Sequence, residues 1–262
     1  MTVHNPINPR NSGSGFLSGD NQTIWAARHS FLDRLQAHTV DLSKRFPPED
    51  VWKRLLSEPF PVKIALYDAQ GKILFDTRNG RDFVTIKSIL PNSGLIEELE
   101  KQMGWQAMQL ADWIEFRLSR PLDRPAIARR TTPLRQGEMV YSLGYPDKTE
   151  TRRSRLGVPD SDGIRLFVTK GQVITAAQGS RHEDLAKLSA EKRSALLAEL
   201  DRYFLFHTAD IAPGSSGGPL VDAEGRLVGQ VLIKYNADPK DSYSRTGVFA
   251  PRREVIDLLV KP

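Results

Sequence analysis

The chain has 262 residues, of which 39% are hydrophobic, and it carries a formal net charge of +5. This length and composition predict a globular protein built as one large β unit or as two small domains. The absence of cysteine excludes disulfides and thiolate zinc sites, and it leaves the redox compartment undetermined. No apolar run reaches the roughly 18 residues of a membrane-spanning helix, so no transmembrane segment is expected.

Glycines and prolines divide the first third of the chain into short apolar stretches, which favours β-strands. Residues 14–17 and 23–28 are two such stretches around a Ser-Gly-Asp-Asn turn. Residues 62–67 and 72–75 alternate across Asp-Ala-Gln-Gly, a pattern typical of a β-hairpin. No convincing strand precedes Gly13, so we expect the natural chain to begin further upstream.

Helical spacing of apolar residues occurs in residues 48–57, 93–103 and 182–204. We expect these three helices to be insertions on a β scaffold. A fourth helix, over residues 253–260, is expected to close the chain.

Residues 214–220 read Gly-Ser-Ser-Gly-Gly-Pro-Leu and lie between apolar runs at 204–206 and 220–233. A flexible linker has a similar composition, but linkers join separable units, whereas these runs have the pattern of strands from one core. We therefore predict a sharp turn that presents Ser216 as a nucleophile. The backbone N–H groups of Gly214 and Ser216 would converge on one oxygen and form an oxyanion hole.

A serine nucleophile needs a histidine that accepts its proton and a carboxylate that orients the histidine. The chain contains five histidines. His29 follows the predicted strand 23–28, where a short turn can present it, so it is the candidate base. His4 lies near the chain start, His38 in a polar stretch, and His182 at the start of a predicted helix.

Three separated segments together resemble a known family. They are residues 13–29, which end in Trp-Ala-Ala-Arg-His; residues 112–122, with Gly-Tyr-Pro at 144–146; and residues 208–220, with the Gly-Ser-Ser-Gly-Gly-Pro run. The chain resembles trypsin-like (chymotrypsin-fold) serine peptidases of the bacterial type, similar to HtrA-type proteases and bacterial glutamyl endopeptidases. The order His29, Asp112, Ser216 is that of chymotrypsin and differs from those of subtilisin and the α/β-hydrolases.

The resemblance implies a mostly β fold of two antiparallel six-stranded β-barrels, with helical insertions and a C-terminal helix. Residues 1–130 would form the barrel that carries His29 and Asp112, and residues 131–262 the barrel that carries Ser216. It implies a serine endopeptidase that hydrolyses polypeptides through an acyl-enzyme. Ser215 precedes the nucleophile in place of an aspartate, so activation by cleavage of the amino terminus is not expected.

The orienting carboxylate has alternatives, because Asp76 and Asp82 lie at the end of the predicted hairpin. Asp112 is favoured since its segment has the apolar alternation that a buried carboxylate needs. Asp210 lies six residues before Ser216, at the offset where trypsin has its specificity aspartate. His207 or Lys234 would neutralise Asp210 or favour acidic substrates, so we expect a preference for small or aliphatic side chains over basic ones.

Other chemistries fit the sequence poorly. The scattered histidines give no metal-binding pattern and the glycines give no phosphate-binding pattern, so neither a metal nor another cofactor is expected. The competing hypothesis is a non-catalytic binding module of the same fold that uses a basic face, because arginines are frequent from residue 117 to 135. They alternate with apolar residues and prolines, which favours a solvated face over specific nucleic-acid binding.

The sequence leaves the oligomeric state and the compartment open. The resemblance implies a periplasmic or secreted protein, but residues 1–11 lack the basic-then-apolar pattern of a signal peptide.

Overall fold

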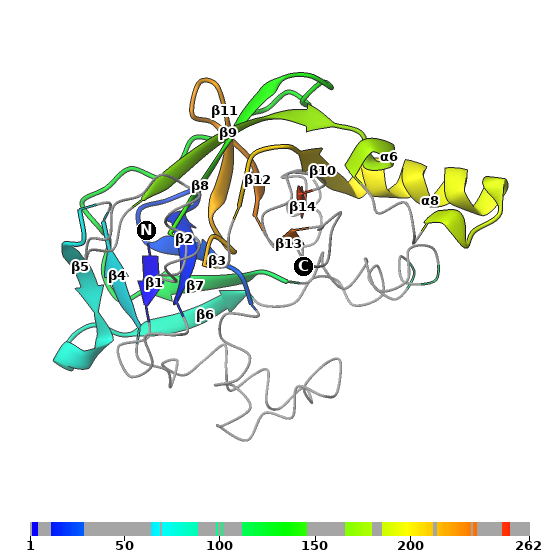
Figure 1. The fold of residues 1–262 in the computed structure, drawn as a ribbon. Helices are drawn as coiled ribbons and strands as arrows, with labels where there is room; N and C mark the ends of the chain where they lie inside the picture. Colours follow the sequence, from blue (N-terminus) through cyan, green and yellow to red (C-terminus); the bar gives the residue numbers. More distant parts are fainter. Residues whose placement is uncertain are drawn as a thin grey trace, which may run out of the picture.

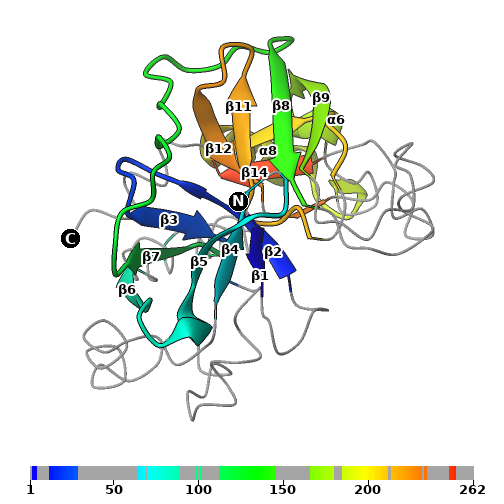
Figure 2. The ribbon, with the colours of Figure 1, turned by 90° about the vertical axis from the view of Figure 1, so that its left-hand side faces the viewer.

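The computed structural model describes residues 2–4, 12–28, 64–68, 70–88, 98, 101, 112–145, 166–179, 185–211, 214–231, 233–234 and 248–251. These residues form two seven-stranded sheets, the first from strands β1 to β7 and the second from β8 to β14 (Figure 1). Figure 2 shows the second sheet above the first. All strand pairs within both sheets are antiparallel.

The first sheet has the strand order β5-β4-β1-β2-β3-β7-β6. Its strands are β1 (Thr2–His4), β2 (Ser12–Leu17), β3 (Thr23–Ala26), β4 (Ala65–Tyr67), β5 (Ile73–Asp76), β6 (Val84–Ser88) and β7 (Ile114–Leu118). Apolar side chains from these strands form one buried cluster, which includes Ile24, Leu66, Phe75, Ile86 and Phe116. Alternating side chains of a strand point to opposite faces, so this cluster marks the inner face of the sheet.

The second sheet has the order β12-β11-β8-β9-β10-β14-β13. Its strands are β8 (Met139–Gly144), β9 (Phe167–Ile174), β10 (Phe204–His207), β11 (Pro219–Asp222), β12 (Leu227–Gln230), β13 (Ile233–Lys234) and β14 (Val248–Pro251). Its own buried cluster includes Val140, Val173, Leu205, Leu220 and Val228. Each sheet therefore has a separate hydrophobic core.

Two short helical segments, η1 (Thr77–Asn79) and α6 (Ala176–Gly179), accompany a longer helix, α8 (Ala190–Tyr203). The helix α8 begins where the Ser189 hydroxyl accepts a hydrogen bond from the Lys192 N–H, a typical N-cap. It ends at Tyr203 because the next four residues are fully buried in β10.

Several expectations need correction. The sheets have seven strands and not six, and within the described residues no backbone ladder joins β5 to β6, so the first sheet is open where a closed barrel was expected. The extra strand β1 precedes Gly13 and pairs with both β2 and β4, contrary to the expectation that no strand lies there. Its three residues are too few to give a periodic pattern, so only its non-local partners define it.

The helix expected over residues 182–204 begins at Ala190, and Phe204 belongs to a strand. The helices expected over 48–57 and 253–260 lie outside the described residues, as does 93–103 apart from Glu98 and Lys101. The expected hairpin over residues 62–75 is confirmed as β4–β5, and the apolar run over 220–233 contains a second hairpin, β11–β12. The mostly β architecture is confirmed as well.

The segment after β7 connects the two sheets and is the green trace that climbs from the lower to the upper sheet in Figure 2. The N–H of Ile127 donates to the Leu17 carbonyl of the first sheet at 3.2 Å. The carbonyl of the next residue, Ala128, accepts from the Leu227 N–H of the second sheet at 2.7 Å. The change from one sheet to the other is therefore made across the peptide between Ile127 and Ala128.

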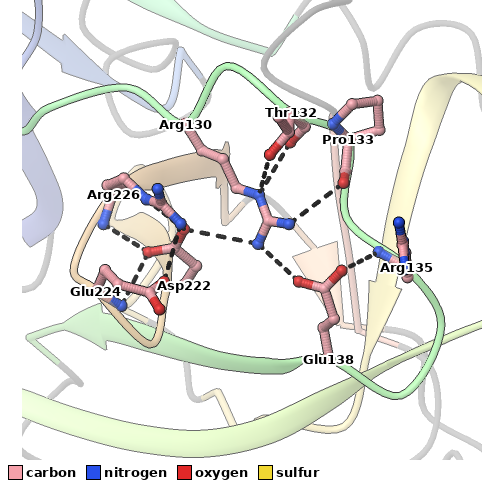
Figure 3. A network of polar contacts seen from close by, with 8 residues as sticks. All are labelled: Arg130, Thr132, Pro133, Arg135, Glu138, Asp222, Glu224 and Arg226. Atoms are coloured by element: carbon pink, nitrogen blue, oxygen red, sulfur yellow. Dashed lines mark hydrogen bonds and ion pairs between the residues drawn. The ribbon is translucent and has the colours of Figure 1, made fainter.

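A network of ion pairs and hydrogen bonds between side chains holds the end of this connection in place (Figure 3). Arg130 Nη1 lies 2.7 Å from Glu138 Oε2 and 3.6 Å from Asp222 Oδ2, and its Nε donates to the Thr132 carbonyl. Asp222 is buried and also receives Arg226 Nη2 at 2.8 Å. Since Asp222 belongs to β11 and Glu138 immediately precedes β8, the network holds the connection against the strands that carry the site.

Candidate active site

The turn over residues 214–218 is held by main-chain hydrogen bonds, both within the turn and to Val231. Gly214 and Gly217 have φ values of 94° and 86°, in the left-handed region that favours glycine. The Gly218 N–H donates to the Ser215 carbonyl at 3.0 Å, and the Gly217 N–H donates to the Val231 carbonyl at 2.7 Å. The segment is thus a packed turn between β10 and β11 and not a flexible linker.

Small residues are required in this turn because other backbone segments approach it closely. A Cβ atom on Gly217 would lie 2.5 Å from the nitrogen of Ala27, and closer still to the carbonyl oxygen of Ser14. A Cβ atom on Gly144 of β8 would lie 2.8 Å from Ser215 Cβ. The run of glycines and serines therefore reflects close contact with β2, with the end of β3 and with β8.

Ser14 of β2 joins this turn to the first sheet. Its backbone N–H donates to the Ser216 carbonyl at 2.9 Å, and its hydroxyl donates to the Gly214 carbonyl at 2.8 Å. The same hydroxyl accepts from the Tyr145 N–H at 2.9 Å. The sequence shows the Gly-Ser-Gly motif around Ser14, but this contact with a turn 200 residues later has no local signal.

His29, the predicted base, lies outside the described residues, and its neighbour Arg28 is the last described residue of its segment. Strand β3 pairs with β7 so that Ala26 lies opposite Ile114. Two residues further along, this antiparallel register places Arg28 opposite Asp112, and the Arg28 N–H donates to the Asp112 carbonyl at 3.4 Å. Asp112, the predicted carboxylate, is therefore adjacent to the residue that precedes His29.

The side chains of Arg28 and Asp112 also interact. Burial lowers the pKa of the Arg28 guanidinium, and the negative charge of Asp112 opposes this effect. A positive charge so near the predicted triad carboxylate is a feature that the sequence analysis did not single out.

The alternative carboxylates Asp76 and Asp82 have other partners. Asp82 is buried and accepts from Arg120 Nε at 2.9 Å, from the Asp76 N–H at 3.2 Å and from Asn79 Nδ2 at 3.1 Å. Asp76 accepts from Arg78, whose guanidinium holds the pKa of this carboxyl below its usual value. These contacts fasten the turn after β5 to the end of β7, which gives both aspartates a structural role.

A buried aromatic cluster packs the two segments of the candidate site together. The Trp25 and Trp113 rings lie 6.4 Å apart, and Trp25 also packs with Phe16 and with Leu227 of the second sheet. The Trp25 indole N–H donates to the Glu115 carboxylate. Burial raises the pKa of Glu115, although the charge of a lysine and the indole hydrogen bond act in the opposite direction.

The two candidate specificity residues differ in their surroundings. Asp210 is half-buried, and its carbonyl accepts a hydrogen bond from the Thr169 hydroxyl of β9. His207 is fully buried, and within the described residues neither of its ring nitrogens has a hydrogen-bond partner. Burial lowers the pKa of His207 to about 3, so its ring is neutral at pH 7 and does not supply a charge that would neutralise Asp210.

Several arginines of the 117–135 stretch make contacts within the protein. Arg120 pairs with Asp82, and Arg130 pairs with Glu138. The Arg129 guanidinium lies 5.3 Å from the Trp25 ring centroid and donates to the Ser18 hydroxyl. These contacts tie Arg120, Arg129 and Arg130 to the fold.

Among the described residues, no group of three or more His, Asp or Glu side chains is arranged to hold a metal ion. No described helix combines the length and the apolarity needed to cross a bilayer.

Residues 13–229 match the family model of the trypsin-like peptidase domain. The chain belongs to the trypsin-like peptidases. It is accordingly a hydrolase of the serine-peptidase class, as the motifs around residues 29, 112 and 216 predicted. A comparison with curated protein sequences gives no significant match.

Solved structures of similar fold are also serine proteases. The Rv3671c protease of M. tuberculosis in its inactive form is 17% identical, with a TM-score of 0.50, over 99% of this chain and 85% of that one. The serine endoprotease from Yersinia pestis is 15% identical, with a TM-score of 0.50, over 98% of this chain and 62% of that one. Sequence identities of 15% and 17% show that this trypsin-like peptidase shares the fold of these proteases, and they show no more than the fold.

Proposed function

We propose that this trypsin-like peptidase is an endopeptidase in which Ser216 is the nucleophile, His29 the general base and Asp112 the residue that orients His29. Ser216 Oγ attacks the peptide carbonyl while His29 takes its proton, and His29 then gives that proton to the leaving amine. Water, activated by His29, attacks the resulting ester and releases the acid. The N–H groups of Gly214 and Ser216 stabilise the oxyanion in both steps.

One set of backbone contacts carries this proposal. Asp112 is bonded to Arg28, which adjoins His29, and Gly217 packs against Ala27, two residues before His29. The chain neighbours of all three proposed catalytic residues thus meet at one point between the sheets. A triad requires this convergence of segments that are far apart in the sequence.

The substrates are proposed to be polypeptides with small or aliphatic side chains before the cleaved bond. Selection of basic side chains relies on a buried aspartate whose charge is not screened by water. The half-buried Asp210 is partly exposed to solvent, which weakens such selection. Its main-chain contact with Thr169 instead supports a role in shaping the turn.

The proposal is tested by labelling the purified protein with a fluorophosphonate probe and by measuring hydrolysis of a quenched-fluorescence peptide library. Ser216→Ala is expected to abolish labelling and nearly all turnover, since the triad acts as a unit and its remnant gives only about 10³ to 10⁴-fold over water. Ser215→Ala, which removes a neighbouring hydroxyl, is the control and should still be labelled. Unchanged turnover in Ser216→Ala would disprove the assignment.

A further inference from the structure

Ser14 is a buried residue of the first sheet, yet all three of its hydrogen bonds described above are made to segments that adjoin strands of the second. Two of them hold the carbonyls of Gly214 and Ser216. These are the same two residues whose N–H groups form the proposed oxyanion hole. Ser14 therefore holds the peptides Gly214–Ser215 and Ser216–Gly217, which lie on either side of the peptide that carries the Ser216 N–H.

The direction of the hydroxyl bonds is fixed by chemistry. A backbone N–H only donates, so the Ser14 hydroxyl must accept from Tyr145. Its single proton is then given to the Gly214 carbonyl, which only accepts. The hydroxyl thus accepts from the residue that follows β8 and donates to the nucleophile turn, and these two directions cannot be reversed.

Gly214 is the residue of the turn where such a grip is most needed. Its φ of 94° shows that it already uses the conformational freedom of glycine. A glycine can rotate its neighbouring peptide groups at little steric cost, and a rotation here would turn the Gly214 N–H away from the oxyanion. The hydrogen bond to the Gly214 carbonyl fixes the peptide that follows, Gly214–Ser215, and so anchors one side of Gly214.

We propose that Ser14 is a positioning residue that sets the oxyanion hole, through its hydroxyl bond to Gly214 and its backbone bond to Ser216. The inference rests on the proposed function and adds a residue that does not touch the substrate. It also assigns to the first sheet a part in forming a site whose donors belong to the second.

The test replaces Ser14 by alanine, which removes the hydroxyl and keeps the backbone bond to Ser216. A disturbed hole should lower kcat by roughly 10- to 100-fold, less than the loss of a donor itself, with little change in KM. The inhibition constant of a peptide boronic acid, whose adduct with Ser216 is tetrahedral, should rise by a similar factor. If Ser14 had only a structural role, its replacement would lower the thermal midpoint but would not lower kcat and raise the boronate inhibition constant by similar factors.

Ser18→Ala is the matched control. Ser18 is equally buried, follows the same strand, and uses its hydroxyl to accept from Arg129 Nη2 at 3.1 Å, away from the nucleophile turn. It should lose stability to a similar extent as Ser14→Ala and keep the kcat and boronate affinity of the wild type. If Ser14→Ala is not recovered folded, Ser14→Cys is measured instead, and its weakly donating thiol should give a kcat below that of the wild type.

Equal kcat and boronate affinity in the Ser14 and Ser18 variants, with an active wild type, would overturn the inference and leave the proposed function intact. A change in KM alone would overturn it as well. A wild-type protein that neither reacts with a fluorophosphonate nor cleaves peptides would overturn the proposed function, and this inference with it.

Discussion

The backbone N–H of Arg28 donates to the carbonyl of Asp112, just beyond the last paired residues of strands β3 and β7. Strands β3 and β7 thus place the residue before His29 beside the proposed orienting carboxylate. The contact follows from the register between the two strands, and it does not depend on the loops between them.

Asp112→Asn should reduce turnover by roughly 10⁴-fold, because an amide favours the wrong histidine tautomer. Asp82→Asn should keep most of the turnover and lower the thermal midpoint, because it breaks the ion pair with Arg120 in the first sheet. Steady-state kinetics and thermal unfolding of both variants check this. A larger loss of turnover in Asp82→Asn would move the triad to the earlier hairpin.

Gly217→Ala should abolish activity and strongly destabilise the fold, because the added Cβ would collide with the backbone of Ser14 and Ala27. Gly225→Ala is the matched control, since Gly225 also has a positive φ but has nothing within 4 Å of an added Cβ. It should cost only about 1–2 kcal/mol of backbone strain and remain active. Similar effects of the two substitutions would show that the close packing at Gly217 is unimportant.

His207 should make the fold sensitive to mild acid. Burial lowers its pKa to about 3 from a usual 6.5. Between these two pH values the unfolded chain binds a proton at this ring and the folded chain does not. The resulting stability is fully present above pH 6.5 and is lost as the pH falls toward 3. His207→Leu should remove this dependence, and its free energy of unfolding relative to the wild type should rise by about 2 kcal/mol between pH 7 and pH 5. Urea unfolding at both pH values measures the change, and a constant difference would contradict it.

Glu115 should act in the opposite sense, because burial raises its pKa in the fold. The folded state then binds a proton more tightly than the unfolded state, so stability is lost as the pH rises through the raised pKa. Glu115→Gln keeps an oxygen that accepts the Trp25 indole N–H and removes the buried charge, so its thermal midpoint at pH 8 should equal or exceed that of the wild type. Lys87→Gln should change little, since Lys87 is exposed and its Nζ lies 3.9 Å from Glu115. A marked loss of stability in Glu115→Gln at pH 8 would contradict this.

Asp210→Ala should leave the cleavage preference for small or aliphatic residues unchanged and lower the rate modestly. Profiling the wild type and the variant on one peptide library measures this. Dominant cleavage after lysine or arginine that disappears in Asp210→Ala would instead make Asp210 the specificity residue.

Local pattern was sufficient where an element is defined by its own residues. The hairpin β4–β5 could be predicted because Asp68 sits in its turn, where its carboxylate accepts from the Gln70 and Lys72 N–H groups. The β11–β12 hairpin has a comparable turn at Asp222, whose side chain accepts from the Glu224 and Arg226 N–H groups.

Prediction failed where a local cap was overlooked and where the decisive contacts are distant. The helix α8 begins later than its apolar spacing indicates, because the cap at Ser189, a local signal, sets its start. In the candidate site, too, local sequence signals could be recognised and distant contacts could not. Ser216 and Asp112 could be singled out from their own segments, but the bonds from Ser14 to the turn join residues some 200 positions apart. The charge of Arg28 beside Asp112 likewise depends on strand pairing.

Ile127 is bonded to the first sheet and Ala128 to the second, so the connection between them contains no spare length. A rotation of one sheet against the other finds no slack loop at this point and has only the backbone torsions of these two residues to take it up. The two halves are therefore closely coupled there. The position of Ser216 relative to its proposed partners from the first sheet depends on this short connection.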